Sequence, residues 1–265
     1  MNEATRAAAP AWQRWLVYAA AIVGIGAPLV ALAMGLMTGA GWIDWRIGLG
    51  ALKPLSQAAM VAMVVALVAM LLLALRRRWR ALILPLVTVV VAAIFVGIVA
   101  YNFGKTEFVP FIHDVTTDIV NPPQFETLSL REDNLETVPV PKDPDLEPLD
   151  NVGRWRLLHL RYYGDIRPIA VPANVPATVE AARELVEERG WELAAAEPAT
   201  GRVEATATVS IYRFKDDIVL RITPNPNGPG SIVHMRSVSR VGVSDLGVNA
   251  ARVRDFLADL EQRLG

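Results

Sequence analysis

The chain has 265 residues, of which 53% are hydrophobic and 20% charged, and its formal net charge at pH 7 is −1. This composition excludes a disordered chain, and its apolar fraction exceeds that of an ordinary water-soluble domain. The apolar excess must therefore be concentrated in particular segments. The absence of cysteine also excludes a disulfide framework.

Three uncharged segments, 15–37, 55–75 and 81–103, each have the roughly 20 residues that a helix needs to cross a bilayer. We expect three transmembrane helices. Pro28 and Pro85 are compatible with them, because Pro85 lies near the start of its segment and neighbouring helices can satisfy the carbonyl group that Pro28 frees.

A cleaved signal peptide is the alternative for the first segment. Arg6 and Arg14 precede it, and it contains the small-residue pattern Ala31-Leu32-Ala33. However, its apolar run is longer than the roughly 7–15 residues of a signal-peptide core, and two further apolar segments follow. We therefore favour a transmembrane helix.

The loops set the expected orientation. Four of the five residues 76–80 are arginine, whereas loop 38–54 offers only Arg46 and Lys53. Cytoplasmic loops of membrane proteins are enriched in Lys and Arg, so we expect turn 76–80 and the N-terminus in the cytoplasm. The sequence thus predicts a multi-pass protein of the bacterial inner membrane whose C-terminal part lies in the periplasm.

The charge of −1 is a cancellation between two parts of the chain. Residues 1–103 carry eight Lys and Arg against two Asp and Glu, a net charge of +6, and residues 104–265 carry 18 against 25, a net charge of −7. We expect a membrane domain at 1–103 and an extracytoplasmic domain at 104–265. Nucleic acid and anionic lipid are poor partners for the acidic domain, because both favour a basic surface.

Within the second domain, the segment 121–150 contains six prolines mixed with acidic residues, a pattern typical of an extended loop. A helix is predicted from about Pro176 to Gly190 and another around 253–260. The apolar residues that define these two helices are Val179, Ala182, Leu185 and Val186, and then Val253, Phe256, Leu257 and Leu260.

Four strands are predicted between the two helices. They cover 191–197, 203–211, a segment around 218–222, and 231–239, where apolar and polar residues alternate or turn residues set the limits. Short connections favour antiparallel pairing. The predicted fold is therefore an α-helical membrane anchor with three transmembrane helices, followed by an α+β domain with a four-stranded antiparallel sheet and two helices on one face.

Several strings of this domain resemble the bacterial membrane-protein family called domain of unknown function 1499. They are IHDVTTD at 112–118 with NPP at 121–123, YGDI at 163–166, FKDD at 214–217 and SVSRVGVSDLGVN at 237–249. The resemblance covers about 110–263 and departs from the family pattern at Gly164, where a proline is expected, and in the acidic stretch around 130–150. It implies an extracytoplasmic α+β domain, often preceded by membrane spans, and no particular activity.

The last of these strings supplies candidate ligand-binding residues. Ser244, Asp245 and Asn249 are residue types that accept hydrogen bonds from the free N–H groups at a helix start. Arg240 lies at the unfavourable end of the helix dipole and so requires an anionic partner. That partner is either an internal carboxylate, which we favour, or the phosphate or carboxylate of a ligand. The internal candidates are Asp114, Asp118, Asp165 and Asp217.

His113 and Asp114 are the strongest acid–base candidates, because a carboxylate can orient an imidazole. No nucleophile motif accompanies them, so a structural role is favoured. His159 and His234 lack the spacing of metal ligands, and we expect neither a metal nor a cofactor. The adjacent acids Asp216 and Asp217 are expected in a solvated hairpin turn.

Three hypotheses for function follow. The first is a binding or accessory module of the cell envelope that is anchored in the membrane and has other membrane or envelope proteins as partners. The second is an enzyme for a lipid-linked or cell-wall anionic substrate, with Arg240 binding the substrate and His113 and Asp114 transferring protons. The third is a structural subunit of a membrane complex, assembled through small-residue steps such as Gly35 and Gly39.

Overall fold

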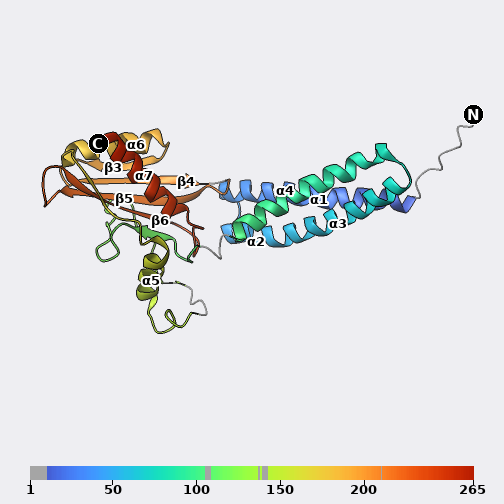
Figure 1. Ribbon diagram of the computed structural model, residues 1–265, viewed down its shortest axis with the longest axis horizontal. Helices are drawn as coiled ribbons and strands as arrows, with labels where there is room; N and C mark the ends of the chain where they lie inside the picture. Colours follow the sequence, from blue (N-terminus) through green and yellow to red (C-terminus); the bar gives the residue numbers. More distant parts are fainter. Residues whose placement is uncertain (1–10, 105–108, 137, 139–142, 210) are drawn as a thin grey trace, which may run out of the picture. The chain divides into compact units, whose positions relative to one another are not determined.

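A computed structural model describes residues 11–104, 109–136, 138, 143–209 and 211–265. The chain divides into two compact units, Met1–Gly104 and Lys105–Gly265 (Figure 1). Arg6 of the signal-peptide alternative, parts of the predicted loop 121–150, and residue 210 of the predicted strand 203–211 lie outside the described residues.

The first unit contains three helices that are long and apolar enough to cross a membrane. The bundle consists of α1 (Ala11–Gly39), α3 (Leu52–Leu75) and α4 (Ile83–Gly104). The short helix α2 (Trp45–Gly50) precedes α3, and the 3-10 turn η1 (Trp79–Leu82) precedes α4. The three predicted apolar helices are thus confirmed, with α1 beginning earlier in the chain than the uncharged segment.

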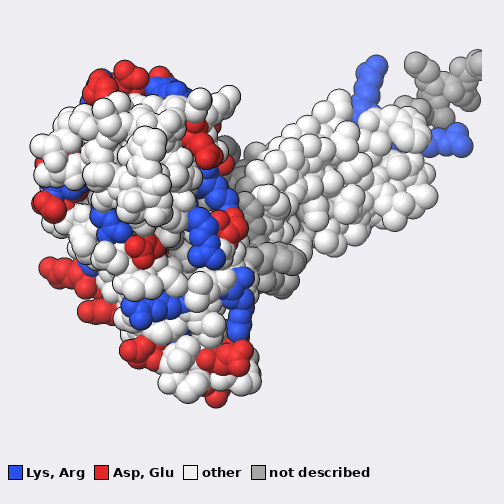
Figure 2. Space-filling view, turned by 60° about the vertical axis from the view of Figure 1, so that its left-hand side comes forward, with Lys and Arg blue, Asp and Glu red and all other residues white. Residues whose placement is uncertain are grey.

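Small residues let the three helices approach closely. Ala59 and Ala66 of α3 and Ala92 of α4 are fully buried. A Cβ atom added at Gly24 of α1 would lie 2.6 Å from Cγ2 of Thr88 on α4, so a larger residue there requires the Thr88 side chain or one of the helices to shift. The outward faces are apolar and exposed, and Figure 2 shows the flank of the bundle almost free of charge, with basic side chains at one end.

The second unit is built on one antiparallel sheet with the order β1-β6-β5-β4-β3, in which β2 also pairs with β6 (Figure 1). Its strands are β1 (Asp114–Thr116), β2 (Ile169–Val171), β3 (Glu192–Glu197), β4 (Arg202–Val209), β5 (Phe214–Pro224) and β6 (Ser231–Ser239).

The prediction of four strands was wrong, because the sheet has six. The four predicted strands correspond to β3, β4, β5 and β6. The two additional strands, β1 and β2, have three residues each and pair with β6 alone, β1 opposite Arg236–Val238 and β2 opposite Ser231–Val233. A three-residue strand is too short to show an alternating pattern, so its sequence carries no strand signal.

The helices α6 (Val175–Glu188) and α7 (Val248–Leu264) cover one face of the sheet, as predicted for two helices (Figure 1). Asn174 begins α6 by accepting a hydrogen bond from the Ala177 N–H at 3.0 Å. The apolar side chains of both helices meet the alternate residues of the strands in one core, which includes Val179, Leu185, Val253, Phe256, Ile218 and Leu220.

The sequence did not predict the helix α5 (Asn151–Tyr163), which begins where Asp150 accepts a hydrogen bond from the Gly153 N–H at 2.7 Å. It lies along the outer edge of β1. Nε1 of Trp155 donates to the Asp114 carbonyl at 2.8 Å, and Nε2 of His159 accepts from the Thr116 N–H at 3.1 Å. Both backbone groups point away from β6, so α5 satisfies an edge that would otherwise be open.

The sheet face opposite α6 and α7 is covered by the chain between β1 and α5. The described residues of 121–150 form turns and bends, in agreement with the predicted loop. Glu204 of β4 is fully buried on this face, and its carboxylate accepts hydrogen bonds from three consecutive backbone N–H groups, those of Glu126, Thr127 and Leu128. Both faces of the central strands are therefore buried.

Candidate functional site

Asp114, the predicted general acid or base, forms a buried ion pair. Its two carboxylate oxygens accept hydrogen bonds from Nε and Nη2 of Arg236, at 3.0 and 2.6 Å. Both residues are buried. Arg236 also donates to the Pro123 carbonyl at 3.2 Å, so the pair joins β1 and β6 to the loop that covers them. A bidentate pair of this kind fixes geometry.

His113 is connected to Asp114 through a third residue, Asn134, rather than directly. Nδ2 of Asn134 donates to Oδ2 of Asp114 at 2.8 Å, and Oδ1 of Asn134 lies 3.1 Å from Nε2 of His113. Because a carboxylate only accepts, this bond fixes the amide orientation and assigns the proton to Nε2 of the imidazole. Burial lowers the pKa of His113, and the nearby Arg131 lowers it further.

Arg240 finds its anionic partner in Asp217. Nε and Nη2 of Arg240 donate to the two carboxylate oxygens at 2.8 and 2.9 Å, and Oγ1 of Thr206 donates to the same carboxylate at 2.7 Å. The Arg240 side chain is 42% exposed, while the Asp217 side chain is 6% exposed. The pair raises the pKa of Arg240, chiefly through the hydrogen bond from Arg240 to Asp217.

The two ion pairs lie on the same face of the sheet. Asp114 and Asp217 are both in register with Val238, from opposite sides of β6. Residues in register on neighbouring strands point to the same face, so Asp114 and Asp217 lie under the loop rather than under α6 and α7. Asp216 points the other way.

Asp216 pairs with α7 on the helix-covered face. Nη2 of Arg252 donates to Oδ2 of Asp216 at 2.7 Å, and both side chains are buried. The expectation of a solvated hairpin turn for Asp216 and Asp217 was therefore wrong. Both acids lie inside β5, buried on opposite faces.

Asn249 is a structural junction at the start of α7. Its Oδ1 accepts from the Ser237 hydroxyl at 2.7 Å and also from Nη1 of Arg252. Its Nδ2 donates to the His113 carbonyl at 3.0 Å and to Oγ of Ser239 at 2.9 Å. Every polar atom of this buried amide is used within the fold.

Asp245 and Ser244 shape the turn before α7, in keeping with the predicted residue types. The Asp245 carboxylate accepts from the N–H groups of Gly247 and Asn249, at 2.9 and 2.6 Å. Burial raises the pKa of Asp245 to about 6, against the opposing effect of these two hydrogen bonds. Oγ of Ser244 donates to the Pro110 carbonyl at 3.3 Å.

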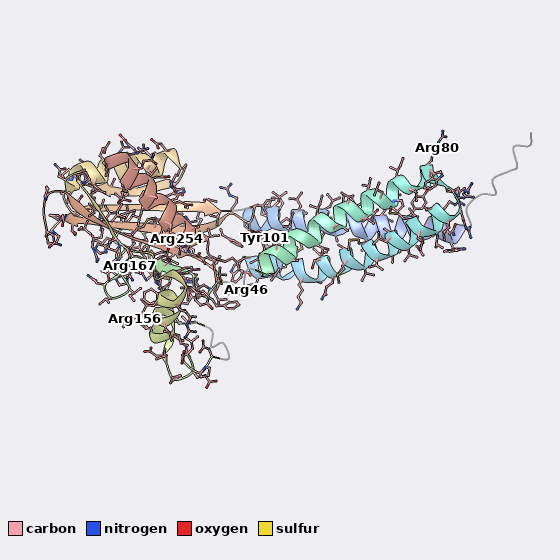
Figure 3. The ribbon with its side chains drawn as sticks, in the orientation of Figure 1. Arg46, Arg80, Tyr101, Arg156, Arg167 and Arg254 are labelled. Atoms are coloured by element: carbon pink, nitrogen blue, oxygen red, sulfur yellow. The ribbon has the colours of Figure 1, made fainter. Side chains whose placement is uncertain are left out.

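Asp165 is separate from the other candidates. It pairs with Arg254 of α7 (labelled in Figure 3) at 2.6 and 2.7 Å, and both side chains are exposed. The Arg254 guanidinium lies 5.6 Å from the ring centroid of Tyr163. The ion pair with Arg254 lowers the pKa of Asp165. This surface pair joins the segment after α5 to α7.

A shallow surface hollow, too small to enclose a water molecule, lies beside the Arg240–Asp217 pair. Arg131 is among its lining residues, and its guanidinium group donates to the Gly242 carbonyl at 2.8 Å and pairs with Asp133. The other lining residues are Phe125, Leu130, Val238 and Ser239. Among the described residues, no group of three or more His, Cys, Asp or Glu side chains is arranged to hold a metal ion.

The sequence did not reveal Arg236, Arg252 and Asn134 as partners. Arg236 carried one signal, a charged residue in the middle of an apolar strand, which implies a buried carboxylate nearby. Arg252 borders the apolar stripe of the closing helix. Asn134 lies in the acidic stretch that departs from the family pattern, and no local signal distinguishes it.

Together these features define an α+β protein in which three helices able to cross a membrane precede a six-stranded antiparallel domain held by buried Arg–Asp pairs. The family model described as "Protein of unknown function (DUF1499)" matches residues 114–260, which is more than half of the chain. The chain belongs to this family, as the sequence motifs predicted. No curated protein matches the chain.

Proposed function

We propose that this chain is a multi-pass protein of the bacterial inner membrane whose α+β domain lies in the periplasm and acts as a binding or accessory module of the cell envelope. The arginines of turn 76–80 support the orientation, because such clusters remain on the cytoplasmic side. An odd number of crossings then carries the C-terminal domain to the other side.

One observation carries the module hypothesis: the charged residues of the family motifs form ion pairs inside the domain. Asp114, Asp216 and Asp217 each bind an arginine, and each of these pairs ties a strand of the sheet to another element or to the neighbouring strand. Charges fixed in this way stabilise one conformation. Because these carboxylates are already paired inside the domain, they favour a protein that acts by binding a partner on its surface.

A second candidate, an enzyme for a lipid-linked or cell-wall anionic substrate, is favoured by one observation. Arg131 and Arg240 both line the hollow next to β6, and Arg240 is partly exposed. Two guanidinium groups at one hollow suit a phosphate or carboxylate. However, both are already paired with carboxylates, and the proton-transfer candidate His113 is buried against Asn134.

The third hypothesis, a structural subunit assembled through small-residue faces, has less support. Gly35 of α1 is buried within the unit, as are Ala59, Ala62, Ala66 and Ala69 of α3. These small residues serve packing inside the bundle.

A pair of fusions after Gly265 tests the location. Alkaline phosphatase, which folds actively only outside the cytoplasm, is expected to be active, and green fluorescent protein exported by the same route is expected to be dark. The reverse pattern would place the domain in the cytoplasm and refute the periplasmic part of the proposal.

Complementation separates the module from the enzyme. In a strain lacking the gene, membrane permeability to a hydrophobic dye is measured after expression of the wild type or His113→Gln. A module predicts full restoration by a His113→Gln protein that accumulates to the wild-type level, because His113 is buried and is not part of the presented surface. A well-expressed His113→Gln protein that fails to restore the barrier would favour the enzyme.

A further inference from the structure

The second unit presents apolar side chains at the end where the chain enters it. At this end β1, β3 and β5 begin and β4 and β6 finish. Two backbone hydrogen bonds join the end of β6 to the segments beside it. The Ser239 N–H donates to the His113 carbonyl and the Arg240 N–H to the Lys215 carbonyl, both at 3.0 Å. We call the surface formed here by Phe111, residues 211–215, Val243 and Val248 the tether-end patch.

Four large apolar side chains of this patch are substantially exposed. Phe111 is 40% exposed, Ile211 and Val243 43%, and Val248 41%. They come from three separate segments: the chain before β1, the β4–β5 turn, and the loop between β6 and α7. Apolar residues gathered from different segments at one end of a domain indicate an interaction surface rather than scattered exposure.

The β4–β5 turn has the composition of a segment that enters a bilayer surface. Its residues Ile211-Tyr-Arg-Phe-Lys215 alternate apolar or aromatic side chains with cations. The rings of Tyr212 and Phe214 stack with centroids 5.4 Å apart. Tyrosine prefers the boundary between headgroups and acyl chains, where its ring is apolar and its hydroxyl is hydrated, and the long stems of Arg and Lys let their charges reach the phosphates.

The length of the connecting chain keeps this patch near a membrane. Only four residues of sequence separate Gly104, the end of a helix able to cross a bilayer, from Val109. At no more than about 3.6 Å per residue, the five steps span at most roughly 18 Å in any arrangement of the two units. The patch, which begins at Phe111, is therefore kept within reach of the membrane surface at high effective concentration, and weak apolar contacts suffice for docking.

We propose that the tether-end patch docks on the lipid bilayer, with Ile211 and its neighbours inserted at the boundary between headgroups and acyl chains. The net charge of −7 on residues 104–265 argues against attraction of the whole domain to anionic lipid. The docking is therefore apolar and does not require anionic headgroups. It is also independent of the side of the membrane on which the domain lies.

The absence of cysteine from the chain makes a direct test possible. The full-length protein carrying Ile211→Cys is spin-labelled and reconstituted in phosphatidylcholine vesicles, and the collision rates of the label with oxygen and with a water-soluble nickel chelate are measured. The control is Asn227→Cys in the β5–β6 turn. This exposed site lies at the other end of the eleven-residue strand β5, roughly 35 Å away.

The proposal predicts an oxygen-to-nickel collision ratio several-fold higher at position 211 than at position 227. Adding Ile211→Ser to a protein labelled at Val243→Cys should lower the ratio at 243, because the patch acts as one surface. Equal ratios at 211 and 227 would overturn the proposal. So would a raised ratio that appears only when phosphatidylglycerol is added, since that result means electrostatic attraction instead of apolar docking. Because only lipid is present, a protein partner cannot produce the expected signal.

Discussion

Asp114 and Arg236 form a buried bidentate ion pair between the strand β1 and its neighbour β6, with N–O distances of 2.6 and 3.0 Å. Asn134 completes the coordination of the carboxylate from the covering loop. The pair thus joins three segments that are far apart in the sequence, and its removal affects the fold rather than a reaction.

Replacing Arg236 with Met should lower the free energy of unfolding by about 3–5 kcal/mol, because Asp114 would remain as a buried, uncompensated charge. Thermal unfolding of the full-length protein in detergent should show this as a fall of at least about 6 °C in Tm. The matched control is Arg156→Met on α5, where the arginine is exposed (Figure 3), with an expected change within about 0.5 kcal/mol. Arg236→Met combined with Asp114→Asn should recover part of the loss. Equal Tm values for the two single variants would contradict the structural role of the pair.

Arg240→Ala should be milder, with a loss of about 1 kcal/mol. Its guanidinium is partly exposed, so solvent screens the interaction, and Asp217 keeps the hydrogen bond from Thr206. The measurement is the same Tm, compared directly with Arg236→Met. A Tm unchanged within error would mean that the pair does not stabilise the fold. That result would favour a ligand-binding role for Arg240.

The imidazole of His159 should make the protein sensitive to acid. Burial lowers its pKa to about 4, below the value of 6.5 in the unfolded chain. Between these values the unfolded state binds more protons, so stability falls as the pH drops from about 6.5 to 4, by up to roughly 3 kcal/mol.

The test compares the pH dependence of unfolding of wild type and His159→Gln from pH 7 to 4.5. The glutamine can still accept from the Thr116 N–H but does not titrate, so the variant should lose less stability over this range. Asp245, whose pKa is raised to about 6, has the opposite effect, but it is present in both proteins. Parallel curves would show that His159 does not contribute to the acid sensitivity.

Gly230→Ala should cost about 2 kcal/mol or more. The backbone there has φ of +94°, and an added Cβ would lie 2.0 Å from the Val171 carbonyl oxygen, where β2 meets the β5–β6 turn. Gly228 lies in the same turn, but a Cβ added to it would meet nothing within 4 Å. Gly228→Ala is thus the control, expected within about 0.5 kcal/mol of wild type in Tm measurements. Similar losses at both positions would argue against the close approach of β2.

Local periodicity predicted the elements that contribute most to the core. The apolar stripe of 179–186 and the alternation of β4 are strong local signals, and both elements are present where expected. The strands β1 and β2 could not be predicted, because each is defined by its pairing with β6 and not by a pattern of its own. The packing of α5 could not be predicted either. Its His159 accepts a hydrogen bond from the edge of β1, and no residue spacing in the sequence indicates such a contact.

The candidate site was predictable in its residue types and not in its pairing. An anionic partner for Arg240 followed from the helix dipole, and four acids were available. The choice of Asp217 depends on the register of β5 and β6, in which Asp217 lies opposite Val238, two residues before Arg240. Asp216 and Asp217 point in opposite directions because successive residues of a strand face opposite sides of the sheet. The sequence analysis placed both residues in a hairpin turn, so it did not predict this arrangement.

The contact between α5 and β1 has a consequence for self-association. Sheets polymerise head to tail when each molecule offers two open edges, one to receive the next strand and one to provide it. Here Trp155 and His159 occupy the outward backbone groups of β1, which leaves β3 as the outer strand on one side and the three-residue strand β2 on the other. A three-residue strand offers few backbone groups to a further strand, so edge-to-edge pairing favours a closed dimer through β3 over a continuing fibre.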